Sequence, residues 1–98
     1  MKFVQTKNAP SAIGPNSQAV VLNGMVYTSG QIALTPDGQM LEDDVILQTK
    51  QVLKNLEAVL IEAGSSLQNV VKTTIFIADM DDFATINEIY AEAFGSHK

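Results

Sequence analysis

Residues 70–90 have the sequence VVKTTIFIADMDDFATINEIY, which predicts a β-strand followed directly by an α-helix. The first part, residues 70–78, is dense in β-branched and aromatic side chains, which favour a strand. Neither of the two alternating faces of this segment is polar throughout. We therefore expect an inner strand that is covered at least partly on both sides.

An acidic cluster separates this predicted strand from the helix. Asp79, Asp81 and Asp82 favour a helix start, because an aspartate side chain accepts hydrogen bonds from the free N–H groups of a first turn. Apolar residues at helical spacing then form one stripe: Phe83, Ile86, Tyr90 and Phe94. The same spacing places Glu88 and Glu92 on the solvent side, and only a few residues follow this helix.

Length and composition indicate one small domain, residues 1–98, with a single core. Hydrophobic residues make up 46% of the chain, and no apolar run approaches the roughly 20 residues of a membrane span. The absence of cysteine excludes a disulfide scaffold and a thiolate metal site. These features predict a cytoplasmic protein that does not span a membrane.

The charge pattern argues against a nucleic-acid partner. The net charge is −5, and all 6 basic residues are lysines that are scattered along the chain. Proteins that bind DNA or RNA usually carry clustered positive charge, because phosphate contacts dominate their affinity. The chain contains no arginine.

The N-terminal part contains the clearest turn signal. Ala19–Leu22 and Met25–Thr28 are apolar runs joined by Asn23 and Gly24, a pair that fits both positive-φ positions of a type I′ hairpin turn. A short strand is expected within residues 1–5 and a loop over residues 6–17. The length of that loop is compatible equally with a binding role and with a simple surface connection.

A long helix is predicted next, beginning at Glu42, Asp43 and Asp44 and ending at Gly64. Its buried stripe is expected to comprise Ile46, Thr49, Leu53, Leu56, Leu60 and Ala63, widened by Val52 and Val59. The order of elements predicts an α+β fold in which two helices pack on one face of a sheet. Because no strand follows the second helix, we expect a chain that is incomplete or that borrows strands from a neighbour.

Little chemistry follows from the residues alone. The only histidine is His97, near the end of the chain, and no phosphate-binding loop or dinucleotide fingerprint is present. The acidic clusters at 42–44 and 79–82 are explained better as helix caps than as calcium ligands.

Three longer motifs carry a family resemblance. GPNSQAV at 14–20, YTSGQIAL at 27–34 and VVKTTIFIADMDDFATINEIYAEAF at 70–94 closely resemble the RidA/YjgF family. The resemblance implies a chorismate-mutase-like fold, a homotrimer and ligand clefts between subunits. It also implies hydrolysis of reactive enamines and imines, such as 2-aminoacrylate or 2-iminobutanoate, to 2-keto acids and ammonia, without a metal or cofactor.

The resemblance also assigns site residues. Ser29 and Gly30 match the family's pocket lining, Ile32 an apolar wall, and Asn87 a polar residue on the second helix that helps to shape the cleft. Asn16 stands where the family commonly has a pocket tyrosine. Ser29 as a strand cap and Asn87 as a solvent-facing side chain are the alternatives without a function.

Two further strands of the family lie outside this resemblance. They carry an arginine that holds the substrate carboxylate and a glutamate that positions water, so the domain is expected to be C-terminally incomplete relative to the family. An imine deaminase whose activity depends on those strands is one interpretation. A non-catalytic small-molecule-binding or assembly subunit is the alternative, and an endoribonuclease or translation inhibitor ranks third.

Overall fold

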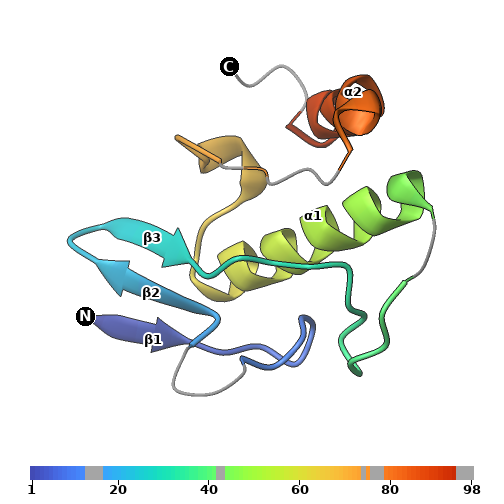
Figure 1. The fold of residues 1–98 in the computed structure, drawn as a ribbon. Helices are drawn as coiled ribbons and strands as arrows, with labels where there is room; N and C mark the ends of the chain where they lie inside the picture. Colours follow the sequence, from blue (N-terminus) through green and yellow to red (C-terminus); the bar gives the residue numbers. More distant parts are fainter. Residues whose placement is uncertain (13–16, 42–43, 74, 76–78, 95–98) are drawn as a thin grey trace.

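The computed structural model describes residues 1–12, 17–41, 44–73, 75 and 79–94. Figure 1 shows a small antiparallel sheet beside a long helix, with a second helix beyond it. The strands are β1 (Lys2–Val4), β2 (Ala19–Leu22) and β3 (Met25–Thr28), and the helices are α1 (Val45–Glu62) and α2 (Phe83–Phe94). Short 3₁₀ turns, η1 (Leu67–Asn69) and η2 (Met80–Asp82), follow α1 and precede α2. The predicted α+β class is confirmed.

The hairpin has the predicted bounds. β2 and β3 pair antiparallel with Leu22 opposite Met25, and β1 pairs with the other side of β2, with Val4 opposite Ala19. Asn23 has φ 53° and Gly24 has φ 79°, so the turn occupies the left-handed region that this dipeptide tolerates best. The hairpin is therefore specified locally.

The core lies between the sheet and α1. Val4 and Ala19 project from the strands onto Val59 of α1, and Ala9 closes the cluster from the loop that follows β1. α1 contacts β3, whereas α2 contacts α1 and the two 3₁₀ turns. In Figure 1, α2 accordingly lies across α1 and away from the strands.

α1 begins where the acidic cluster predicts. The Asp44 carboxylate accepts from the N–H groups of Ile46 (3.0 Å) and Leu47 (3.1 Å), and Gly64, with φ 85°, follows the last turn. The predicted stripe is largely confirmed, because Thr49, Leu53, Val59 and Leu60 are buried. Ile46 is exposed, however, and Asn55, which was not predicted, is fully buried. Apolar periodicity did not identify Asn55, since a carboxamide is polar by type whatever it contacts.

The strand predicted over residues 70–78 is absent from the described part of that range, which comprises residues 70–73 and 75. Val71 is 81% exposed there. A strand needs a neighbouring backbone to complete its hydrogen bonds, and the described sheet, β1-β2-β3, contains none of these residues. Composition therefore indicated a strand preference that the described residues of this range do not realise. Residues 74 and 76–78 lie outside the described residues.

The second helix forms after a tighter turn than predicted. Asp79 accepts from the Asp81 N–H at 2.9 Å and caps η2, and α2 begins at Phe83. Ile86 and Ile89 are the buried residues of α2, whereas Phe83, predicted for the stripe, is half exposed. Glu88 and Glu92 are exposed, as predicted.

One tyrosine on α2 has an altered ionisation. The rings of Tyr90 and Phe94 pack with centroids 5.7 Å apart. Partial burial raises the pKa of Tyr90 above its ordinary value, because desolvation penalises the phenolate. Across the described residues, no helix combines the length and apolar character that crossing a bilayer requires.

Candidate ligand pocket

A pocket of about 270 Å³ lies where the chain leaves β3. One side is the loop wall, residues 10–12, and the other is the strand-end wall, residues 29–32 and 34. Gln18, directly before β2, lines the space between the walls. The pocket is thus formed by irregular segments attached to the hairpin, and a volume of this size suits a small molecule.

Ser29 continues the hairpin pairing by one residue beyond β3. Its N–H donates to the Gln18 carbonyl at 3.0 Å, and its hydroxyl donates to the same oxygen at 3.1 Å. Because this contact uses the hydroxyl proton, Oγ retains lone pairs with which it could accept from a ligand. Ser29 thus extends the strand pairing and also lines the pocket.

The next residues offer main-chain donors. In the described part of the chain, the N–H groups of Gly30, Gln31 and Ile32 have no hydrogen-bond partner. Successive unpaired N–H groups favour an anionic group such as a carboxylate. A Cβ at Gly30 would meet no atom within 4 Å, so the glycine leaves open space beside these donors.

Apolar side chains complete the strand-end wall. Ile32 is exposed and Leu34 is half-buried, and both line the pocket. None of the described lining residues carries an ionisable side chain. The described residues also bring together no group of three or more His, Cys, Asp or Glu that could hold a metal. The arrangement can therefore bind a small anion with an apolar portion, but the lining itself supplies no side-chain acid or base.

Only some of the site residues predicted from the sequence line this pocket in the described structure. Ser29, Gly30 and Ile32 come together in the pocket. Asn87 lies exposed on α2 and does not line the pocket, and Asn16 lies outside the described residues. The roles assigned to these residues remain predictions.

Sequence reasoning missed Gln18, Gln31, Leu34 and the three residues of the loop wall. Gln18 stands within the GPNSQAV motif, where it directly precedes a strand and is 3% exposed. The available signal for a role in binding was a polar residue directly before the hairpin strand and next to the loop over residues 6–17. Residues 10–12 are part of that loop, but their composition alone does not predict that they line a pocket.

Comparisons with known proteins identify the family and the fold. The family model described as "Endoribonuclease L-PSP" matches residues 6–98. A RutC family protein of Synechocystis is 52% identical over 96% of this chain and 74% of its own length. The 2-iminobutanoate/2-iminopropanoate deaminase of Mus musculus is 50% identical over 95% of this chain and 70% of its own length. The crystal structure of E. coli TdcF with bound serine superposes with a TM-score of 0.92 at 45% identity, covering 99% of this chain and 76% of that one.

Proposed function

The chain belongs to the family described as Endoribonuclease L-PSP, the RidA/YjgF family, and from this premise we propose that it hydrolyses small reactive enamines and imines to 2-keto acids and ammonia. The mouse relative is named for this reaction on 2-iminobutanoate and 2-iminopropanoate. The observation that carries the proposal is the pocket beside β3, where unpaired N–H groups adjoin an apolar wall. A short 2-imino acid has a matching carboxylate and a matching apolar end.

The pocket residues support a specific binding mode. The substrate carboxylate accepts from the N–H groups of Gly30 and Gln31, and its alkyl group packs on Ile32. The Ser29 hydroxyl, whose proton is donated to the Gln18 carbonyl, accepts from the imine N–H. Water then adds to the imine carbon, the carbinolamine releases ammonia, and the carbonyl of the 2-keto acid forms. Orientation of this kind lowers a barrier by several kcal/mol, about 7 or more in favourable cases.

Proton transfer requires ionisable groups, which are missing among the lining residues that the structure describes. The family resemblance assigns carboxylate binding to an arginine and water positioning to a glutamate on two later strands. An arginine binds a carboxylate bidentately, and lysine does not reproduce that geometry. We therefore propose that residues 1–98 bind the ligand and that full catalysis requires those strands.

A coupled assay tests this proposal. A dehydratase generates 2-aminoacrylate or 2-aminocrotonate, and release of the 2-keto acid is followed with mass-verified protein. The 98-residue chain is compared with a version extended by the family's last two strands. We expect the extended chain to accelerate release and the shorter chain to bind 2-ketobutanoate with little acceleration. Equal acceleration by both would assign carboxylate binding to a residue of this chain, with Lys72 the first to be substituted.

A non-catalytic ligand-binding or assembly subunit is the second candidate, and the lack of an ionisable side chain among the described lining residues favours it. Binding of 2-ketobutanoate without acceleration by either version would support this alternative. Ile32→Asp distinguishes pocket binding from surface binding, because the introduced carboxylate repels a keto-acid anion. A matched exposed substitution, Ile61→Asp, serves as the control, since Ile61 lies on α1 outside the pocket.

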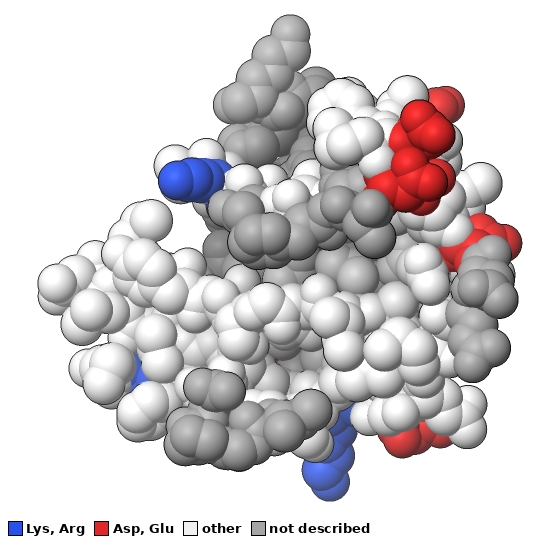
Figure 2. Space-filling model, in the orientation of Figure 1, with Lys and Arg blue, Asp and Glu red and all other residues white. Residues whose placement is uncertain are grey.

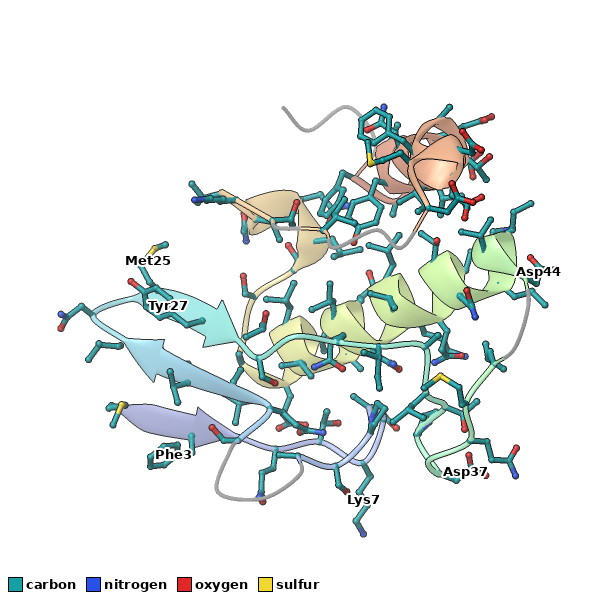
Figure 3. All side chains as sticks on the ribbon, in the orientation of Figure 1. Phe3, Lys7, Met25, Tyr27, Asp37 and Asp44 are labelled. Carbon is teal, nitrogen blue, oxygen red and sulfur yellow. The ribbon has the colours of Figure 1, made fainter. Side chains whose placement is uncertain are left out.

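We also propose that the chain forms a homotrimer through the outer face of its sheet. Strand alternation places Phe3, Leu22, Met25 and Tyr27 on the face opposite the core, and all are exposed. Figure 3 shows Phe3, Met25 and Tyr27 projecting from the strands. An apolar patch of this kind favours contact with another protein surface. Sedimentation of the unmodified chain should give a trimer at micromolar concentration, and Tyr27→Lys should shift it to monomer; a monomeric parent chain contradicts this proposal.

RNA is not the proposed partner, despite the family's description. On the face shown in Figure 2 the lysines lie apart, and acidic residues gather along the side that carries α2 and the beginning of α1. Six basic against eleven acidic residues provide few phosphate contacts, which salt would screen. Filter binding should detect no single-stranded RNA complex at about 150 mM salt; tight, salt-resistant binding would contradict the proposal. A cytoplasmic location also remains a prediction.

A further inference from the structure

Two carboxamide side chains are buried beside the pocket. Gln18 is 3% exposed and Asn55 is 0% exposed. Burying a carboxamide is unfavourable unless its donors and acceptor find partners. In the described part of the chain, no buried side-chain nitrogen or oxygen lacks one. Most of these partners are main-chain atoms of the irregular segments that form the pocket walls.

Gln18 joins the two walls. Its Nε2 donates to the carbonyls of Thr6 (3.1 Å), Ala9 (3.3 Å) and Pro10 (2.8 Å), and its Oε1 accepts from the Thr6 N–H (2.6 Å). Its main-chain carbonyl meanwhile accepts both hydrogen bonds of Ser29. The side chain therefore holds the loop wall, and the main chain of the same residue holds the start of the strand-end wall.

Asn55 holds the far part of the strand-end wall to α1. Its Nδ2 donates to the carbonyls of Ile32 (3.3 Å) and Leu34 (2.8 Å). Its Oδ1 accepts from Gln51 Nε2 at 2.9 Å, one helical turn earlier. Both amide hydrogens and the oxygen are thus engaged, which fixes the orientation of the side chain.

We propose that Gln18 and Asn55 are positioning residues, which set the separation of the two walls and thereby the affinity of the pocket for its ligand. Neither is a catalytic residue, because the amide of each bonds main-chain groups of the wall segments and acts on the ligand only by placing those segments. An acid of the same shape cannot replace either amide, since its ionised form has no donor for the wall carbonyls. Only the identity of the ligand rests on the proposed function.

The test uses isosteric variants of the version extended by the family's last two strands, which is the version expected to show turnover. Gln18→Glu and Asn55→Asp preserve size and remove the donors. Gln48→Glu is the matched control, because Gln48 Nε2 donates to the Leu41 carbonyl at 3.0 Å and neither residue lines the pocket. We expect the KM for the imine and the Kd for 2-ketobutanoate to rise at least tenfold in the pocket variants. The kcat should stay within about threefold, and the control should stay within twofold on all three quantities.

Amide hydrogen exchange separates this inference from the proposed function. Exchange of the Thr6 amide, which donates to Gln18 Oε1, should accelerate at least tenfold in Gln18→Glu, and that of the Leu34 amide, which donates to the Ile32 carbonyl, in Asn55→Asp, with no change in the control. A parent chain without turnover or ligand binding contradicts the proposed function, but the exchange rates still test the positioning role. The positioning role is overturned if the pocket variants fold and match the control in KM, Kd and exchange rates.

A milder variant covers the case in which the isosteric acids do not fold. Gln51→Ala removes only the hydrogen bond to Asn55 Oδ1 and places a good helix former on α1. We expect a two- to threefold rise in Kd together with faster Leu34 exchange. An unchanged Kd and unchanged exchange in a folded Gln51→Ala protein would count against the role of Asn55.

Discussion

The described residues up to η1 and those from residue 70 onward are both rich in apolar side chains but differ in how many of them are buried. Val59, in the first part, is fully buried between α1 and the sheet, whereas Val71, in the second, is 81% exposed. Met80 and Phe83 are also exposed in the second part. Figure 1 shows the cause, because the first part folds back on itself as hairpin and helix while the second contacts mainly α1. Apolar sequence leads to burial only where the chain provides an opposing surface.

Valine truncation should reveal this difference most strongly. Val59→Ala removes two methyl groups from a closed site and should lower the free energy of unfolding by about 2 kcal/mol. Val71→Ala is the same substitution at an exposed site and should change it by less than about 0.5 kcal/mol. Urea unfolding at one fixed protein concentration measures both, because self-association would otherwise shift the midpoint. Comparable losses at the two sites would mean that residue 71 is covered in solution.

Helix capping offers a second, smaller contrast. Asp44 accepts from two N–H groups at the start of an 18-residue helix, and its replacement in Asp44→Ala should cost about 1 kcal/mol. Asp79 accepts from one N–H group of a 3-residue turn, so Asp79→Ala should cost less than about half of that. Asp44→Asn retains the accepting oxygen and serves as the control. Thermal unfolding measures all three, and a larger loss for Asp79→Ala would reverse the comparison.

The smallest expected effect is a pH dependence located on α2. The folded-state pKa of Tyr90 lies above its ordinary value of 10.0, because burial disfavours the phenolate. Below pH 10.0, the ordinary pKa, Tyr90 is protonated in both the folded and the unfolded chain, and stability does not depend on this group. As the pH rises above it, the unfolded chain releases the proton first, so stability falls. Tyr90→Phe should show a shallower loss in alkaline urea titrations; identical slopes would remove Tyr90 as the cause.

The same contrast explains how much the sequence predicts. The Asn23–Gly24 turn and the Asp44 cap were predicted correctly, because each satisfies its own hydrogen bonds within a few residues. The strand over residues 70–78 was predicted from composition, but its described residues form none, because pairing depends on a remote backbone.

Within the candidate pocket, the family resemblance indicated Ser29, Gly30 and Ile32, which do line one space. It did not indicate Gln18 or Asn55. Their hydrogen bonds reach main-chain atoms up to 12 and 23 positions away in the sequence, respectively. A residue type carries no information about such distant carbonyls, so the supporting contacts appeared only with the structure.

The order of the described sheet, β1-β2-β3, has a consequence for handling the protein. β3 is an edge strand whose sequence, MVYT, contains no charge, and Met25 and Tyr27 on it are exposed. Natural edge strands usually carry a lysine, a proline or a bulge that discourages pairing with another chain. In the described sheet β3 carries no such device, so we expect concentrated solutions to lose protein by edge-to-edge aggregation of folded molecules before they lose it by unfolding.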